Sequence, residues 1–213
     1  ELDSESRHLV LLCENEEGYR NLSYLVSMGW TEGFYIKPRI DLELLRQYSG
    51  GLIALSACLA GEIPRRLRNG EYENAKAYAL ELSHIFGPDR FYLELQDHGI
   101  RDQAIVNQGI LRIHRETGLP MVCTNDAHYL RKEDAEAHDV LLCIQTGKTI
   151  DDENRMRYEP RNFYLRSEEE MAALFAGYEG ALENTSKIAD MCNLDFSFGK
   201  YHLPEFRLPE GYD

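Results

Sequence analysis

Three apolar segments of the sequence, each typical of a buried strand, end close to side chains that can bind a metal. These side chains are Cys58 after residues 51–55, Glu94 and His98 within and after residues 91–95, and Asp126 and His128 after residues 120–124. Thiolate, carboxylate and imidazole are the ligand types of zinc, and carboxylate with imidazole also suits manganese or iron. Because Asp126 and His128 are two residues apart, both point to the same side of an extended segment. Their spacing therefore lets both reach one metal cluster.

Each of these side chains also has an ordinary structural interpretation. An Asp-x-His at a strand end is more often a turn or a helix cap than a ligand pair, and Cys58 suits a small buried apolar residue. Glu94 alternates with apolar neighbours and would then face solvent, while Asp97-His98-Gly99 suits a turn. The remaining histidines carry no motif of their own: His8, His84, His114, His138 and His202. Only the convergence of several groups would favour a metal site.

The composition limits the class of protein. The 213 residues suit one domain or a domain with an appendage, and 43% are hydrophobic, which is enough to fill a core. A formal net charge of −14 weighs against a broad basic surface for nucleic acid and is compatible with bound divalent cations. Five widely spaced cysteines without a C-x-x-C weigh against a disulfide framework and a structural zinc finger, and favour a reducing cytoplasm.

Neither a membrane span nor a signal peptide is expected. No apolar run approaches the roughly 18 residues that a membrane helix needs, and the first residues lack a basic start and an apolar core. The sequence does not begin with Met, so we expect it to start inside a longer protein.

Apolar segments with strand character alternate with amphipathic helices. The expected strands are 9–13, 51–55, 91–95 and 120–124, and the expected helices are 17–27, 41–48, 72–86, 106–117, 137–144, 167–175 and 181–192. Strands separated by helices of this length predict parallel pairing through crossovers, in either a barrel or an open doubly wound sheet. No glycine-rich phosphate loop follows any strand, which weighs against a nucleotide-binding fold.

Other reaction classes find less support in the sequence. There is no G-x-S-x-G for a serine nucleophile. Cys58 with a distant His could act as a thiol nucleophile, but no further motif supports it. The basic stretch Arg65-Arg66-Leu67-Arg68 is more simply a solvated helix face than a nucleic-acid site.

Long stretches of the sequence resemble one protein family. They are "HLVLLCENEEGYRNLSYLVS", "EGFYIKPRID", "GLIALSACLAGEIPR", "FYLELQDHG", "TNDAHYLRKEDAEAHDVLLCIQTGKT" and "FGKYHLPEF". Together they closely resemble the polymerase-and-histidinol-phosphatase (PHP) domain of the bacterial replicative DNA polymerase III alpha subunits, which are C-family DNA polymerases. The resemblance covers nearly the whole chain, in order and with natural spacing.

The resemblance implies an α/β fold, a distorted seven-stranded, TIM-like β/α barrel that holds up to three metals. The family's early ligands, a His-x-His, an Asp-His pair and a Glu, have no counterpart here. We therefore expect the C-terminal two-thirds of the barrel with a helical C-terminal extension. Residues 1–145 would form the later β/α units, 146–195 the helical extension, and 196–213 a linker towards the polymerase palm.

The resemblance also assigns residues. His8, Cys58, Asp126 and His128 match family ligand positions for Zn²⁺ or Mn²⁺, in a site that would be incomplete in this piece. His8 comes at the start of its expected strand, whereas the other three follow the ends of theirs. Glu94 and His98 match no ligand motif, so we expect them to support the ligands through hydrogen bonds without binding metal.

Two functions follow from the resemblance. In the first, the chain is part of a DNA-replicating polymerase and forms a metal-dependent phosphoesterase module, for 3′–5′ proofreading or pyrophosphate hydrolysis. In the second, it is a non-catalytic platform that stabilises the polymerase and contacts a proofreading subunit. Nucleotide transfer, with its Mg²⁺, would belong to the palm, which is absent here. The implied partners are the palm, thumb and fingers, primer–template DNA, and proofreading and clamp subunits, in the bacterial cytoplasm and without a membrane.

Overall fold

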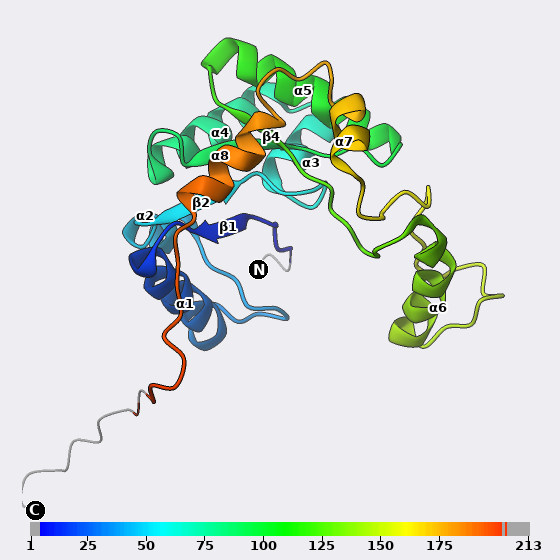
Figure 1. Ribbon diagram of the computed structural model, residues 1–213, viewed down its shortest axis with the longest axis horizontal. Helices are drawn as coiled ribbons and strands as arrows, with labels where there is room; N and C mark the ends of the chain where they lie inside the picture. The colour runs from blue at the N-terminus through cyan, green and yellow to red at the C-terminus, as the bar shows by residue number, and fades with distance from the viewer. Residues whose placement is uncertain (1–4, 202, 204–213) are drawn as a thin grey trace, which may run out of the picture.

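The computed structural model describes residues 5–201 and 203, and it contains one four-stranded sheet with helices on both faces (Figure 1). The strands are β1 (Val10–Cys13), β2 (Leu52–Leu55), β3 (Phe91–Leu95) and β4 (Met121–Cys123). The helices are α1 (Glu16–Thr31), α2 (Leu42–Gln47), α3 (Glu62–Arg68), α4 (Tyr72–Phe86), α5 (Arg101–Thr117), α6 (Ala135–Thr146), α7 (Glu168–Leu174) and α8 (Glu183–Met191), with a short 3-10 turn at Lys132–Asp134. The α/β class expected from the sequence is confirmed.

The order of the strands in the sheet is the same as their order in the chain. Strands β2, β3 and β4 are parallel, as predicted, and α3, α4 and α5 form their crossovers. The prediction is wrong for the first strand, because β1 pairs with β2 in the antiparallel sense, with Val10 opposite Leu55 and Cys13 opposite Leu52.

The connection between β1 and β2 explains this reversal. Helix α1 leads away from the sheet, and the following segment with α2 leads back, so the chain returns to the edge that it left. The backbone N–H of Glu14 donates to the carbonyl of Gly51 (2.9 Å), and Gly18 of α1 packs directly on Gly51, which has a φ of 69°. A single crossover helix would instead have carried the chain to the opposite edge.

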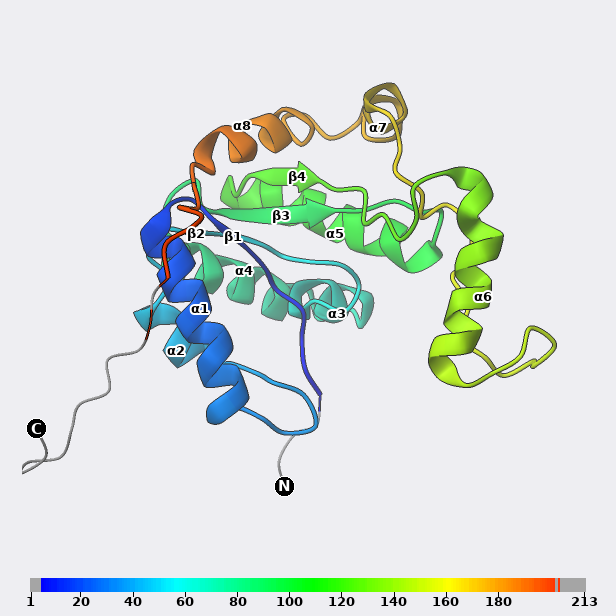
Figure 2. The ribbon, with the colours of Figure 1, turned by 60° about the horizontal axis from the view of Figure 1, so that its bottom comes forward.

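Both faces of the sheet are covered, with the main core on one side (Figure 2). Alternate strand residues such as Leu93 and Leu95 pack against α3, α4 and α5, and the other alternates, such as Ile53 and Tyr92, pack against Ile188 of α8. Strands β2 and β4 therefore read as continuous apolar runs, as expected for strands that are buried on both faces, whereas β3 carries one charged residue, Glu94.

Several boundaries differ from those expected from the sequence. Helix α1 continues to Thr31 instead of ending at residue 27, and α3 was predicted only as a basic helix face. Helix α6 stands apart from the sheet at the end of a long connection (Figures 1 and 2). Within the described residues, no helix is both long and apolar enough to cross a membrane.

The proposed division of the chain remains a prediction. Within 146–195, Phe175 and Ala181 belong to the main core and α8 covers the second face of the sheet. At the start of the expected linker, the Phe196 ring packs on Tyr19 of α1 at 5.1 Å. Residues 202 and 204–213 of that linker lie outside the described residues.

The contact between α1 and Gly51 makes a sharp prediction with a control on the same helix. A Cβ on Gly18 would lie 1.9 Å from the carbonyl oxygen of Gly51, whereas a Cβ on Gly29 would lie 3.5 Å from its nearest neighbour, an ordinary contact. Gly18→Ala should therefore lower the free energy of unfolding by about 1–3 kcal/mol or more through overpacking.

Gly29→Ala should be neutral or stabilise the protein by up to about 1 kcal/mol, because Ala is a better helix former than Gly. Urea unfolding followed by circular dichroism measures both variants. Equal effects of the two substitutions would contradict the close packing of α1 on the start of β2.

Candidate metal centre

The reversal of β1 brings four sequence-distant segments to one edge of the sheet. Strands β2, β3 and β4 end at this edge, and Val10 opposite Leu55 places the start of β1 there as well. The backbone N–H of His8 donates to the carbonyl of Ala60 (3.1 Å), in the loop that follows β2. His8 therefore lies at the same edge as the loops after the parallel strands, although it precedes its own strand.

His8 and Cys58 form a pair at this edge. The His8 Nδ1 and the Cys58 Sγ are 3.7 Å apart. Burial raises the pKa of the Cys58 thiol, and the negative charges of Asp126 and Glu94 raise it further. The loops after β2 and β4 lie close together, because Ala57 and Thr124 both donate hydrogen bonds to Glu94.

Asp126 and His128 form a second pair, in the loop after β4. The Asp126 Oδ1 lies 3.5 Å from the His128 Nε2, and about a third of each side chain is exposed. Asp126 has a φ of 45°, the left-handed region that residues other than Gly seldom occupy. The backbone N–H of His128 donates to the carbonyl of Phe163 (2.8 Å), which fixes the far end of the loop.

The four side chains have the donor atoms that a metal requires, but their positions only partly match a metal site. They supply thiol, imidazole and carboxylate donors, the set that zinc prefers. Among residues 5–201 and 203, however, no group of three or more His, Cys, Asp or Glu lies close enough together to hold a metal ion. The described residues thus offer two neighbouring donor pairs, and a complete centre needs further ligands or a closer approach of the pairs.

Glu94 lies inside the protein, so the solvent-facing interpretation of its alternation is wrong. Only 5% of the residue is exposed. Its Oε2 accepts the backbone N–H of Ala57 (3.0 Å), and its Oε1 accepts the Thr124 hydroxyl (2.5 Å) and the Gln96 Nε2 (2.9 Å). Burial raises the pKa of Glu94, and these three donors act in the opposite direction. The carboxylate contacts loop atoms, not an imidazole, among the described residues.

His98 is fully buried and supports the same loop as a neutral imidazole. The His98 backbone N–H donates to the Gln103 Oε1 (2.8 Å), which turns the Gln103 Nε2 towards the His98 Nδ1 (2.9 Å). The Nε2–H of His98 therefore donates to the carbonyl of Asn125 (2.8 Å), next to Asp126. Burial lowers the pKa of His98, which favours this neutral form.

An aromatic cluster around His128 was not foreseen from the sequence. The His128 ring lies 4.5 Å from Tyr158, 5.5 Å from Phe163 and 5.9 Å from His138, between ring centroids. His138 thus packs, as expected for a helical His, but against a candidate ligand. No local signal links these residues, because Tyr158 and Phe163 come from a later segment. A buried ion pair between Asp139 and Arg155 (2.8 Å) holds α6 to that segment.

Glu62 connects the two sides of the His8–Cys58 pair. It opens α3 directly after the Cys58 loop, and its carboxylate accepts from Arg7 (3.0 Å), Arg65 (2.9 Å) and Arg66 (2.7 Å). Arg7 is the neighbour of His8, so this cluster ties the start of β1 to the start of α3. The hydrogen bond from Arg65, followed by that from Arg66, lowers the pKa of Glu62 to about 2.

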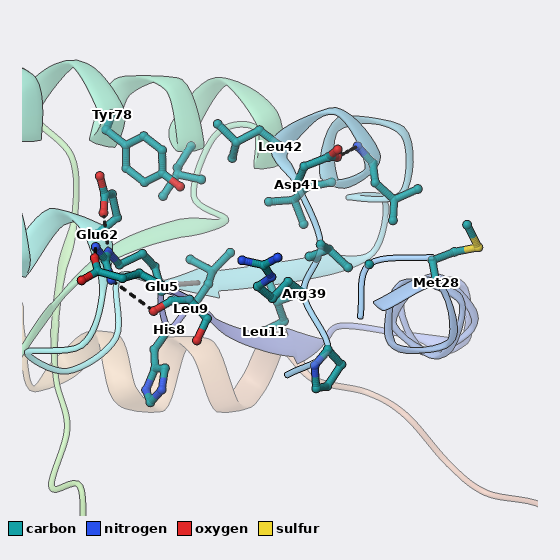
Figure 3. A pocket seen from close by; sticks show the side chains of 18 of the residues that line it. Glu5, His8, Leu9, Leu11, Met28, Arg39, Asp41, Leu42, Glu62 and Tyr78 are labelled. Carbon is teal, nitrogen blue, oxygen red and sulfur yellow. Dashed lines mark hydrogen bonds and ion pairs between the residues drawn. The ribbon is translucent and has the colours of Figure 1, made fainter. Parts of the chain in front are cut away.

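A hollow lies along β1, between this strand and the segment from α1 to α2, and its wall also includes residues of α3 and α4 (Figure 3). It has a volume of about 840 Å³, and its wall includes the apolar side chains of Leu9, Leu11, Leu42 and Ile63. Figure 3 shows the His8 imidazole pointing away from Leu42 and Tyr78. His8, Ser56 and Glu62 nevertheless contribute to its wall, so one end of the hollow reaches the edge where the His8–Cys58 pair lies.

Comparison with known proteins gives consistent matches. Residues 1–98 match the family described as the PHP domain. The chain is 47% identical over 211 residues to the DNA polymerase III subunit alpha of Borreliella burgdorferi, which covers 98% of this chain and 18% of that protein. It is 47% identical over 216 residues to the DNA polymerase III subunit alpha of Thermus aquaticus, with 99% of this chain and 18% of that protein covered. The chain thus spans less than a fifth of the length of these relatives.

The low pKa of Glu62 makes a prediction about pH and stability. Because the folded-state pKa is about 2 and the ordinary value is 4.5, the ionised carboxylate stabilises the fold above about pH 4.5. This stabilisation is lost as the pH falls towards 2. Glu62→Gln should cost on the order of 2 kcal/mol at pH 7, after discounting for the partly exposed arginines.

Urea unfolding at pH 7, 5, 4 and 3 measures the difference between the wild type and Glu62→Gln. The difference should be constant between pH 7 and 5 and shrink at pH 3. Glu71→Gln is the control, since Glu71 is more exposed and lies 3.8 Å from Arg65, and it should change stability little at any pH. A wild-type advantage over Glu62→Gln that is independent of pH would contradict the ionised cluster.

Proposed function

We propose a function for this chain from the premise that it belongs to the PHP-domain family of the bacterial DNA polymerase III alpha subunits. On this premise the chain is a metal-binding module that serves DNA replication within such a polymerase. The observation that carries the proposal is the gathering of His8, Cys58, Asp126 and His128 from three separate segments at one edge of the sheet.

The four residues would hold Zn²⁺ or Mn²⁺, with each donor pair supplying part of the centre. A divalent metal in such a site activates water and neutralises charge on a phosphoryl group. Two residues of this chain would prepare the site for the metal. Partial burial raises the pKa of the Cys58 thiol, which would lose its proton on binding a cation, and the aromatic ring of Tyr158 packs against the His128 ring.

Further strands would complete the site and the barrel. Within the described residues, β1 pairs only with β2, and a hollow of about 840 Å³ lies along β1. A strand with one unpaired edge favours the addition of another strand. We propose that strands outside the described residues pack there, extend the sheet towards a seven-stranded barrel, and bring additional ligands to the edge.

The partners and the polymerase activity belong to the same proposal. The palm, thumb and fingers would belong to the longer polypeptide, and the palm would bind Mg²⁺ and transfer nucleotides to primer–template DNA. Proofreading and clamp subunits would assemble with it in the bacterial cytoplasm. Within this assembly the present chain would act as a phosphoesterase, on a DNA 3′ end or on pyrophosphate.

A non-catalytic role is the second candidate, and one observation favours it. The described donors form two pairs and no cluster of three, whereas Glu94 and His98 give the edge extensive structural support. In this second case the module stabilises the polymerase and contacts a proofreading subunit, and any bound metal contributes only to stability.

The substitution Asp126→Asn separates the two candidates in the full-length protein, purified without chelator. An amide is a much weaker metal ligand than a carboxylate, so the variant should lose metal and any hydrolysis of a DNA 3′ end or pyrophosphate. Nucleotide incorporation should remain within about twofold, because the polymerase carboxylates of the family lie in another domain. Metal content, hydrolysis rate and melting temperature are measured together.

Asp89→Asn is the matched control. Asp89 also has a left-handed backbone (φ 57°), but it lies before β3 and pairs with Lys187 at the other edge of the sheet. It should retain metal and activity. If Asp126→Asn lowers stability while the wild type hydrolyses nothing, the structural role is correct. Undiminished hydrolysis by metal-free Asp126→Asn would show that a contaminating nuclease produced the activity.

A further inference from the structure

We propose that β3 positions both halves of the candidate metal centre, with Glu94 as the positioning residue that couples the Cys58 loop to the Asp126 loop. This inference rests on the proposed metal-binding function for its purpose, but its geometry is independent of any metal. Three observations carry it: the contacts of Glu94 to each loop, the backbone conformation of each loop, and the number of donors around one buried carboxylate.

The first contact holds the loop after β2. The Glu94 Oε2 accepts the backbone N–H of Ala57, the residue before Cys58 (3.0 Å). Ala57 has a φ of 65°, a strained conformation for an L-residue that persists only where the surrounding contacts hold it. In return, the backbone N–H of Glu94 donates to the Ser56 hydroxyl (2.8 Å). Two hydrogen bonds with Glu94 of β3, one from Ala57 and one to Ser56, therefore hold the backbone just before Cys58.

The second contact holds the loop after β4. Thr124 comes two residues before Asp126, and its hydroxyl donates to the Glu94 Oε1 (2.5 Å). The next residue, Asn125, is held through its carbonyl by the imidazole of His98 (2.8 Å). Asp126 then takes up its left-handed φ of 45°. The two residues before Asp126 are therefore both held by hydrogen bonds, Thr124 to Glu94 of β3 and Asn125 to His98 of the following loop.

Only a carboxylate satisfies this arrangement. Three donors converge on the two oxygens of Glu94, from Ala57, Thr124 and Gln96. A glutamine in its place has one acceptor oxygen and an NH₂ group. With the oxygen towards Thr124, the NH₂ would face the Ala57 N–H; with the oxygen towards Ala57, the Thr124 hydroxyl would have to turn and accept, so no orientation accepts from both loops. The loop that loses its acceptor should loosen, and the other loop, coupled to it through residue 94, should loosen with it.

Gln96 supplies the third hydrogen bond to Glu94. Its Nε2 faces the carboxylate of Glu94, and this fixes the orientation of the amide. The Gln96 Oε1 is consequently buried without a hydrogen-bond partner among the described residues. An unpaired buried acceptor costs free energy, so this orientation of the amide favours the hydrogen bond to Glu94 over a partner for its own oxygen.

Hydrogen–deuterium exchange on the metal-free, full-length protein tests the coupling directly. Glu94→Gln should accelerate exchange about tenfold in both loops, residues 56–61 and 124–128. Asn107→Ala is the matched control, because Asn107 is equally buried and its Nδ2 donates to the backbone carbonyl of Gln96 (3.0 Å), which lies in neither of the two loops. It should change exchange near its own contact and leave both loops protected.

Metal binding gives the second readout, as the increase in melting temperature on adding Mn²⁺. Glu94→Gln should lose most of this increase, while Asn107→Ala should keep it even though its melting temperature without metal also falls. Exchange that changes in one loop only, or equally in both variants, would overturn the proposal. If the wild type shows no increase with Mn²⁺, the metal function fails, and the exchange result alone then decides whether Glu94 couples the loops.

Discussion

The close packing of Gly18 on Gly51 determines where the chemistry of this chain can lie. A side chain at Gly18 would meet the Gly51 carbonyl at 1.9 Å, so α1 and the start of β2 can approach only because both residues are glycines. This approach returns the chain to the edge that it left at Glu14, and β1 consequently runs against β2. The start of β1 therefore reaches the carboxyl edge of the parallel strands, and His8 comes to Cys58.

At that edge the protein uses polar groups that are expensive to bury. Glu94 and His98 are almost inaccessible, and burial shifts the pKa of each towards its neutral form. Their hydrogen bonds go mainly to backbone and to short side chains of the loops that carry Cys58 and Asp126. The candidate ligands themselves remain partly exposed. Rigid buried supports beneath accessible donors are what a metal centre requires.

The sequence predicts the local elements better than their arrangement. The apolar run Phe91–Leu95 gave β3 with its observed bounds, because turn residues flank it on both sides. The direction of β1 could not be predicted, since an apolar pattern carries no information on strand direction and the contact that sets it joins Gly18 to Gly51. Glu94 could not be recognised as buried for a similar reason. The residues that enclose its carboxylate, Ala57 and Thr124, come from the loops after β2 and β4, and the alternation within residues 91–95 contains no information on these loops. His8 was assigned by family resemblance, and its place at the edge emerged only from the fold.

The central claim is that residues from β1, the β2 loop and the β4 loop share one metal centre, and X-ray absorption at the zinc edge tests it most directly. In full-length protein loaded with one equivalent of zinc, one sulfur ligand should appear at about 2.3 Å beside nitrogen and oxygen ligands at about 2.0–2.2 Å. The sulfur contribution should vanish in Cys58→Ser and persist in Cys143→Ser, whose thiol is buried in α6. A zinc spectrum without sulfur in the wild type, or one unchanged by Cys58→Ser, would contradict the account.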